Sequence, residues 1–370
     1  MKIVLATGVY PPSLGGPATY AKALTKELQS KGVSVSVVTY GIGESTDPWS
    51  VRRVSLRGGP LLRWWKYARA LRRESADADI VLAFSSISVG MPMILARLKR
   101  PRKILRLGGD FFWERYTDRG GTMGLKEWYA SKGLVTRFAF CVTRFILNHF
   151  DHVVFSTNYQ AELYKKHYLH LPPHCVIENA LPAPQQLSQS MRMLRTSGMQ
   201  NASFRLLYFG RFVGFKNLPA LLEALRALPQ VKLSLVGEGP MEARLRGLTR
   251  TLRIADRVSF LPPLHGTDKE KVFAAHDLLV IPSLTELSPH SALEARAAGL
   301  PVLLTEETGL SPELTAGMVL KELRTAEEIS NAIRNVIQDY AAIATEATSE
   351  PPRRMWKNVA EEWMQLFSPL

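Results

Sequence analysis

Two glutamates, Glu286 and Glu294, lie with seven residues between them in the stretch IPSLTELSPHSALEARAAGLP. Ser288 suits the N-cap of a helix and Pro289 suits its first position, so a helix is predicted over residues 289–298. The first glutamate then lies in the loop before the helix, and the second lies inside it. Small apolar residues fill most of this helix, which predicts that it is largely buried.

The two carboxylates cannot share one narrow helix face, because a separation of eight residues leaves them about 80° apart on a helix. We interpret them as contacts to different parts of one extended ligand. A buried carboxylate without a partner is costly, and a ligand rich in hydroxyl groups would satisfy it. The alternative left open is a solvated helix that carries two ordinary glutamates.

A basic pair, Arg211 and Lys216, lies in the loop GRFVGFKN between a predicted strand at 204–209 and a predicted helix at about 218–228. Asn217 is the expected cap of that helix. A guanidinium can fork onto two oxygens and an ammonium acts as a point charge, and free backbone amides at a helix start favour anions. The pattern predicts a clamp for a diphosphate.

Gly15 and Gly16 lie in a loop between a predicted strand at 2–6 and a predicted helix at 17–30. Glycines allow a ligand to approach the backbone, and the helix start favours an anion. The glycines do not fit the G-x-G-x-x-G pattern, so a dinucleotide cofactor is not supported.

Asp110 lies in the loop GGDFFWE, directly after a predicted strand at 103–107. The carboxyl end of a parallel strand is where ligands bind in open α/β sheets. Asp110 is therefore a candidate site residue, and the alternative is an ordinary turn aspartate.

Strand and helix signals alternate along both halves of the chain, which predicts an α/β protein with two doubly wound, Rossmann-like lobes. The expected ranges are a first lobe at 1–182, a polar linker at 183–203, a second lobe at 204–345 and a C-terminal helical segment at 346–370. The last segment carries a stripe of large aromatic residues, which predicts that its helix packs back on the first lobe.

The composition is that of a folded globular protein, with 46% hydrophobic and 22% charged residues among 370. Two cysteines cannot build a disulfide framework, which favours a reducing cytoplasm. No apolar run is long enough for a transmembrane helix or a secretory signal. Zinc is not expected, because no ligand motif organises the histidines and the cysteine among them, His149, His152, His167, His170, His174 and Cys175.

Positive charge is concentrated in residues 1–180, which hold 26 Lys and Arg against 13 Asp and Glu, while residues 181–370 hold 21 against 20. The basic helix predicted at 61–74 pairs Trp64 and Trp65 with arginines and a lysine, and a second basic cluster spans 97–106. This predicts peripheral docking on an anionic membrane, at the inner face of the cell membrane. The alternative is that the tryptophans belong to the core. Nucleic acid is not expected as a partner, because no recognition module accompanies the charge.

Four motifs, GVYPPSLGGPATY, GRFVGFKN, LVGEGP and PSLTELSPHSALEARAAGLPV, occur in this order over nearly the whole chain. In type, order and spacing they resemble the retaining nucleotide-sugar glycosyltransferases of family 4. The resemblance implies the GT-B fold, in which two Rossmann-like lobes face each other across a cleft.

The resemblance also implies roles for individual residues. Glu286 would contact sugar hydroxyls near the phosphate, and Glu294 would hold the ribose hydroxyls. Arg211 and Lys216 would grip the donor diphosphate. Gly16 would face the phosphates and the acceptor.

Gly15, Glu238, Leu287 and Ser288 complete the expected donor contacts. Two departures from the family pattern stand out. Leu287 and Ser288 replace the glycine and aromatic residue of many members, so Leu287 would narrow the sugar pocket. Asp110 stands in the loop where many members have a histidine that contacts the donor sugar, and it is the expected substitute.

The implied reaction moves a hexose from a UDP- or GDP-sugar to a hydroxyl group of a glycan or polysaccharide precursor, with a lipid-linked acceptor expected. It needs neither a metal ion nor a cofactor, because the cations and helix starts would stabilise the leaving diphosphate. The alternative left open is a nucleotide-sugar epimerase or hydrolase of the same fold, without a separate acceptor.

Overall fold

The structure is a computed structural model that describes residues 1–12, 16–43, 45–131, 133–180, 203–349 and 354–368. Residues 183–202 of the predicted linker therefore lie outside the described residues, and so does Gly15. The chain divides into two compact units. The first consists of Met1–Trp113, Lys126–Ala180 and Arg354–Leu370, and the second of Glu114–Leu125 and Leu181–Arg353.

The first unit contains a seven-stranded parallel sheet in the order β3-β2-β1-β4-β5-β6-β7. Its strands are mainly apolar runs, as is typical of strands that are covered on both faces, although the two edge strands also carry charged or polar residues. They are β1 (Lys2–Thr7), β2 (Ser34–Tyr40), β3 (Val51–Val54), β4 (Ile80–Phe84), β5 (Arg102–Leu107), β6 (His152–Phe155) and β7 (His174–Val176).

The helices of the first unit are α1 (Gly16–Ser30), α2 (Pro60–Glu74), α3 (Met91–Ala96), α6 (Leu134–Leu147), α7 (Asn158–His167) and α16 (Trp356–Phe367), with a π-helical turn η1 (Ser86–Gly90) before α3. Two further helices, α4 (Phe111–Asp118) and α5 (Leu125–Ala130), run across the borders between the units. Gly133 takes an extended conformation (φ −66°, ψ 156°) and separates α5 from α6.

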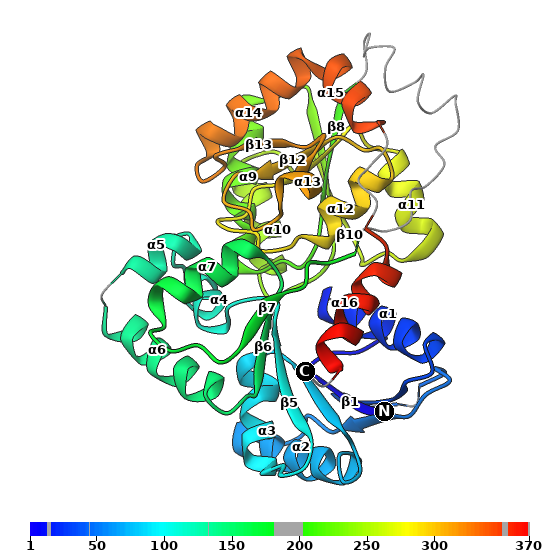
Figure 1. Cartoon of the computed structure of the whole chain (residues 1–370). Coiled ribbons are helices and arrows are strands. Elements are labelled where there is room, and N and C mark those ends of the chain that lie inside the picture. The colour runs from blue at the N-terminus through cyan, green and yellow to red at the C-terminus, as the bar shows by residue number, and fades with distance from the viewer. Residues whose placement is uncertain (13–15, 44, 132, 181–202, 350–353, 369–370) are drawn as a thin grey trace. The chain divides into compact units, whose positions relative to one another are not determined.

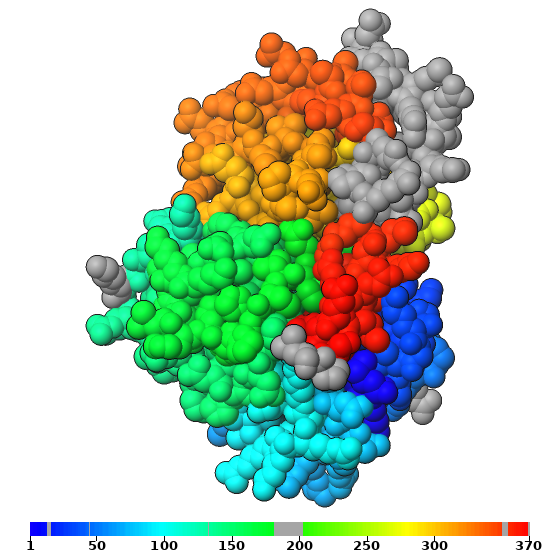
Figure 2. Space-filling model, in the orientation of Figure 1, coloured from blue at the N-terminus to red at the C-terminus, as the bar shows by residue number. Residues whose placement is uncertain are grey.

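Helix α16 packs on the first unit, as the aromatic stripe predicted. The indole of Trp363 is fully buried and donates a hydrogen bond of 2.8 Å to the hydroxyl of Tyr20 on α1. In Figure 2, the red residues of α16 lie beside the blue residues of α1. Right-handed crossovers in this strand order place α2, α3 and α6 on the opposite face of the sheet. Figure 1 shows α6 on the side of the sheet away from α1 and α16.

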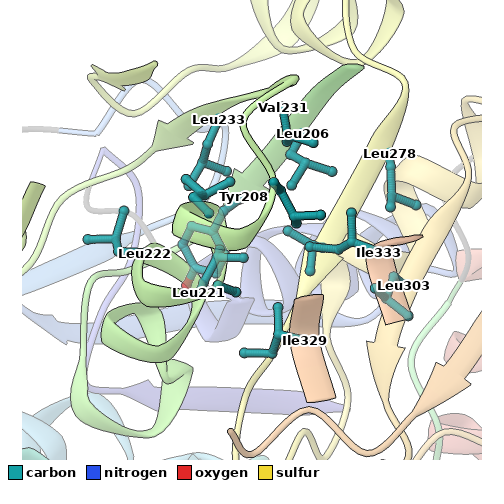
Figure 3. Close-up of a cluster of buried hydrophobic side chains, with 14 of the residues drawn as sticks. Leu206, Tyr208, Leu221, Leu222, Val231, Leu233, Leu278, Leu303, Ile329 and Ile333 are labelled. Carbon is teal, nitrogen blue, oxygen red and sulfur yellow. The ribbon is translucent and has the colours of Figure 1, made fainter. Parts of the chain in front are cut away.

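The second unit contains a six-stranded parallel sheet in the order β10-β9-β8-β11-β12-β13. The strands are β8 (Phe204–Phe209), β9 (Val231–Val236), β10 (Val258–Leu261), β11 (Leu278–Ile281), β12 (Val302–Thr305) and β13 (Val319–Lys321). Leucine, isoleucine and valine side chains from these strands meet those of two covering helices in a buried core (Figure 3).

The helical segments of the second unit are η2 (Gly214–Lys216), α9 (Leu218–Ala224), η3 (Leu225–Ala227), α10 (Glu242–Thr251), α11 (Gly266–Ala274), α12 (His290–Ala297), α13 (Pro312–Thr315), α14 (Ala326–Gln338) and α15 (Tyr340–Ala347). Both units are thus parallel sheets covered by helices, which confirms the predicted fold class of two doubly wound α/β lobes.

The segment Glu114–Leu125 belongs to the second unit, so the predicted first-lobe range 1–182 is interrupted. The amide of Gly214 donates to the carboxylate of Asp118 (3.2 Å), and the amide of Leu125 donates to the hydroxyl of Thr285 (2.8 Å). The returning C-terminal segment also begins later than the predicted residue 346. Helix α15 ends at Ala347, and only residues from Arg354 onward join the first unit.

Candidate functional site

The loops that follow β8 and β9 bind each other through their backbones. The amide of Gly210 donates to the carbonyl of Val236 (3.0 Å), and the amide of Phe212 donates to the carbonyl of Glu238 (2.9 Å). Gly237 has φ +143°, and a Cβ atom there would collide with the carbonyl of Gly210. The close packing of the two loops therefore requires a glycine at the first position of the GEG motif. The side chain of Glu238 is exposed, and its role in donor binding stays a prediction.

The Lys216–Glu286 ion pair lies at the carboxyl ends of β8 and β11. The ammonium of Lys216 contacts Oε1 of Glu286, and the hydroxyl of Ser283 donates to the same oxygen at 2.6 Å. The two paired side chains are only 16% and 6% exposed. The ammonium also lies 4.7 Å from the centre of the Phe215 ring. This pair joins two residues that the motifs assigned separately to the diphosphate and the sugar.

Backbone hydrogen bonds fix the loop that carries Glu286. Its amide donates to the carbonyl of Glu307 (2.9 Å), and its carbonyl accepts from the amide of Gly309 (2.7 Å). The carboxylate of Glu307 accepts hydrogen bonds from Thr285 (2.8 Å) and Arg324 (3.0 Å). The loops after β11 and β12 are therefore held together, and the buried carboxylate of Glu286 has a defined position.

Arg211 is exposed, and its guanidinium makes no hydrogen bond or ion pair with the described residues. Its carbonyl accepts a hydrogen bond of 2.9 Å from Tyr208, whose ring lies in the core of the second unit (Figure 3). Burial raises the pKa of Tyr208 well above its usual value, the negative charge of Glu286 raises it further, and the positive charge of Arg211 lowers it. The charges of Arg211 and Glu286 therefore both act on the hydroxyl of Tyr208. An exposed guanidinium there is available to an anion.

Glu294 lies on α12 and forms an ion pair with Lys269 of α11. The ammonium of Lys269 lies 5.0 Å from the ring centre of Phe209 and 5.7 Å from that of Phe273. The carboxylate of Glu294 therefore has a charged partner without a ligand, and its contact with a ligand stays a prediction. Sequence reasoning missed Lys269 because the partners lie 25 positions apart and no local pattern connects them.

Helix α12 begins at His290 and ends at Ala297, close to the predicted 289–298. Leu287 is buried and Ser288 is half-buried just before its first turn. The guanidinium of Arg296 is buried and donates to the carbonyls of Ala316 (2.9 Å) and Ala347 (2.7 Å). Arg296 thus anchors the helix that carries Glu294.

Asn217 does not cap α9 with its side chain, contrary to the prediction. Its backbone takes the left-handed conformation with φ +53°. Its amide group points elsewhere and donates to the carbonyls of Leu323 and Arg324, both at 3.0 Å. Asn217 therefore ties the basic loop to the segment before α14.

Of the predicted site residues in the first unit, Gly16 is the first residue of α1 and Gly15 lies outside the described residues. Asp110 is only 5% exposed. Its Oδ1 accepts from the amide of Trp113 (3.0 Å), and its Oδ2 accepts from the hydroxyls of Tyr129 (2.6 Å) and Tyr164 (3.3 Å).

Burial raises the pKa of Asp110, although the hydrogen bonds from Tyr129 and Trp113 lower it. The bond from Trp113, three residues further along, is that of a helix N-cap at the start of α4. The structure therefore gives Asp110 a capping role in an aromatic cluster. Its contact with a donor sugar stays a prediction.

The site of the second unit can act on a negatively charged ligand with hydroxyl groups. Arg211 and Lys216 supply positive charge at fixed positions, which is the arrangement that stabilises negative charge as it develops. Glu286 and Glu294 supply carboxylates that accept hydrogen bonds from hydroxyls.

Among the described helices, none has both the length and the apolar character that a membrane-spanning segment requires.

Comparisons with known proteins agree with this arrangement. The "Glycosyl transferase 4-like domain" profile matches residues 15–180, and the "Glycosyl transferases group 1" profile matches residues 194–363. A D-inositol 3-phosphate glycosyltransferase from Pseudarthrobacter chlorophenolicus is 34% identical over 131 residues, which are 33% of this chain and 31% of that protein. The chain thus spans about a third of the length of this curated relative.

Two solved structures resemble the whole chain. Sucrose-phosphate synthase from Thermosynechococcus elongatus has a TM-score of 0.77 at 19% identity, with 99% of this chain and 98% of that chain covered. Anabaena HepE, in complex with UDP and glucose, has a TM-score of 0.75 at 19% identity, with both chains fully covered. At this identity the likeness shows the fold. With both lobes matched by glycosyltransferase profiles and both sheets arranged as in these structures, the chain belongs to the family 4 glycosyltransferases of GT-B fold.

Proposed function

We propose that the protein is a retaining glycosyltransferase that moves a hexose from a UDP- or GDP-sugar to a hydroxyl group of a glycan or polysaccharide precursor, with a lipid-linked acceptor. The observation that carries the proposal is the buried Lys216–Glu286 pair together with the exposed guanidinium of Arg211, which has no partner within the part of the chain that the structure describes. A sugar diphosphate matches this site, because it presents an anion next to hydroxyl groups. The UDP and glucose bound to Anabaena HepE support the same class of donor.

In the proposed reaction, the bond between the anomeric carbon and the diphosphate oxygen breaks, and the diphosphate leaves with the electron pair. The acceptor oxygen forms its bond to the anomeric carbon on the same face, and its proton passes to the leaving phosphate. Arg211 and Lys216 stabilise the growing negative charge, so the proposal needs neither a metal ion nor a cofactor. Glu286 orients the sugar hydroxyls, with its own charge balanced by Lys216.

The remaining donor contacts follow from position. Glu294 accepts hydrogen bonds from the ribose hydroxyls, while Lys269 holds its carboxylate. Backbone amides at Leu287 and Ser288 serve the phosphates at the start of α12. Glu238, Gly15 and Gly16 complete the proposed donor contacts.

A thermal-shift assay with UDP, GDP and ADP tests the donor class. We expect stabilisation by UDP or GDP, and we expect Arg211→Ala to reduce that stabilisation without changing the melting temperature of the free protein. No shift with any of the three nucleotides would contradict the proposal. Donor turnover that proceeds equally fast without any acceptor would replace transfer by epimerisation or hydrolysis.

We also propose that the protein is cytoplasmic and works at the inner face of the cell membrane, attached through the basic surface of the first unit. Trp65 of α2 is 56% exposed, and the guanidinium of Arg69 lies 5.7 Å from its ring centre. Trp64 is half-buried. A tryptophan exposed among arginines supports an interfacial helix better than a core position for Trp65.

A further inference from the structure

Helix α6 carries a stripe of large apolar side chains on its outer face. Leu134 is 83% exposed, Phe138 is 63% exposed and Phe145 is 49% exposed. With Cys141, which is also exposed, these residues fall within about 60° of one another around the helix axis. The opposite face of α6 packs inward through Thr136, Ala139, Thr143, Ile146 and Leu147. A contiguous apolar stripe of this kind on a protein surface marks an interaction site.

Positive charge borders the stripe. Arg137 and Arg144 are exposed on α6, and the helix contains no acidic residue between Leu134 and Leu147. An apolar face bordered by cations is the pattern of a helix that lies in the interface of a membrane. A second copy of this chain would bring a surface of the same positive charge against it, which disfavours self-association.

The stripe leads into a pocket at the C-terminal end of α6. The Nδ1 atom of His149 lies 2.8 Å from the carbonyl of Phe145, and the two rings are 4.5 Å apart. His149 lines a pocket of about 360 Å³ together with the basic residues Arg97, Lys99 and Lys103 and apolar residues that include Leu98 and Phe150.

The pocket combines an apolar wall with available positive charge. Arg97 and Lys99 are exposed and make no ion pair with the described residues, while Lys103 lies 3.8 Å from Asp151. Leu95 on α3, next to the pocket, is 51% exposed. A lipid phosphate with the start of its acyl chains matches both properties. The right-handed crossovers place α2, α3 and α6 on one face of the sheet, so all these features belong to one surface (Figure 1).

We propose that α6 is the element that inserts into an anionic phospholipid leaflet, with its apolar stripe among the acyl chains and the pocket between α3 and α6 around a lipid phosphate. The inference rests on the proposed membrane attachment and deepens it. The charge pattern indicated the basic helix α2 as the inserting element, whereas the exposed face of α6 is mainly apolar and suits insertion better.

The test is sedimentation of the full chain with vesicles of phosphatidylglycerol and phosphatidylcholine, compared with phosphatidylcholine alone. The variant Phe138→Ser/Phe145→Ser removes apolar surface without changing charge, and both side chains are exposed, so the fold is retained. We expect it to weaken binding to the anionic vesicles at least tenfold. The matched control, Ile42→Ser/Leu169→Ser, alters residues that are 84% and 87% exposed elsewhere and should bind within twofold of the wild type.

The pocket is tested by Arg97→Gln/Lys99→Gln. We expect this variant to lose at least fivefold in its preference for phosphatidylglycerol. Arg244→Gln/Arg250→Gln removes the same charge from exposed positions of the second unit and serves as the control. Equal losses in the two variants would mean that only net charge matters, and would overturn the pocket.

Other outcomes separate the inference from the proposals on which it stands. If the wild-type protein does not bind anionic vesicles but is stabilised by UDP or GDP, membrane attachment is overturned and the transferase proposal is left intact. Wild-type protein that binds, together with an α6 variant that binds equally well, overturns only the role of α6. Sedimentation velocity that shows a dimer in the wild type and a monomer in the α6 variant, with vesicle binding unchanged, would assign the stripe to a second copy.

Discussion

Glu286 and Asp110 are both buried carboxylates in loops that follow parallel strands, and each is 5% exposed. Their partners differ. Glu286 pairs with the ammonium of Lys216 and accepts from one hydroxyl. Asp110 accepts from neutral donors, which include the amide of Trp113 and two tyrosine hydroxyls, and burial raises its pKa.

From this difference we predict that Glu286 serves a ligand and that Asp110 serves the fold. A cation balances the charge of Glu286 and lies at the edge of the site, where a second anion can share it. Asp110 uses both of its oxygens to hold α4 and an aromatic cluster in place. A position after a parallel strand, which made Asp110 a candidate and which Glu286 shares, does not distinguish these roles.

The largest expected effect comes from breaking the ion pair. Lys216→Ala and Glu286→Gln should each lower kcat/KM of sugar transfer by about 10²-fold or more, because each removes a preorganised contact to the leaving diphosphate or the sugar. Steady-state kinetics measure the loss, and circular dichroism checks the fold.

The double variant Lys216→Ala/Glu286→Gln sharpens this prediction. Because the two side chains act as one pair, the combined loss should be well below the product of the single losses. Near-normal transfer by Lys216→Ala would remove the clamp from the mechanism.

Arg211→Ala should also lower kcat/KM by about 10²-fold. It is the variant least open to structural side effects, because the exposed side chain has no partner among the described residues.

The next effect concerns Asp110. Asp110→Ala should destabilise the protein by about 2 kcal/mol, because it removes a helix cap and leaves buried tyrosine hydroxyls without an acceptor. Denaturant unfolding measures the change. UDP or GDP binding should survive, since most of the proposed donor contacts lie in the second unit. If Asp110→Ala kept full stability but abolished transfer, Asp110 would act in the reaction rather than in the fold, contrary to the comparison with Glu286.

The pH dependence of Asp110→Asn provides an independent check. A carboxyl whose pKa is raised by folding contributes stability that is fully present below its ordinary pKa of about 3.9 and is lost as the pH rises through the raised value. The melting temperature of the wild type relative to Asp110→Asn should therefore fall as the pH rises from about 4. If the melting temperature of the wild type instead rose relative to that of Asp110→Asn as the pH increased, the folded state would favour the charged form of Asp110.

The smallest expected effect involves the Lys269–Glu294 pair. Glu294→Ala should weaken UDP or GDP binding about tenfold through the lost hydrogen bonds to ribose, and Lys269→Met should weaken it less, because the carboxylate stays but loses its support. Titration calorimetry measures both, and Lys271→Met, at an exposed pair with Asp268, is the control. Tighter binding by Lys269→Met would show that the lysine competes with ribose for Glu294.

The sequence predicted the main strands because parallel strands buried on both faces are continuous apolar runs. It missed β3, β7 and β13, whose three or four residues include charged or polar side chains. At the candidate site, the motifs identified Glu286 and Lys216, but their direct pairing depends on how two distant loops approach each other. Lys269 was missed for the same reason. Asn217 was assigned the wrong partner because a capping pattern describes only local hydrogen bonds.

The division of the chain into units has a consequence for recombination and protein engineering. The chain crosses from one unit to the other after Trp113, Leu125, Ala180 and Arg353. A chimera made by a single junction near residue 182 would deprive the second unit of Asp118, whose carboxylate accepts from Gly214 in the basic loop. It would also deprive the first unit of Trp363, which fills its core beside Tyr20. A chimera that exchanges donor specificity between relatives must therefore take residues 114–125 from the same parent as the second unit, and the C-terminal helix from the same parent as the first unit.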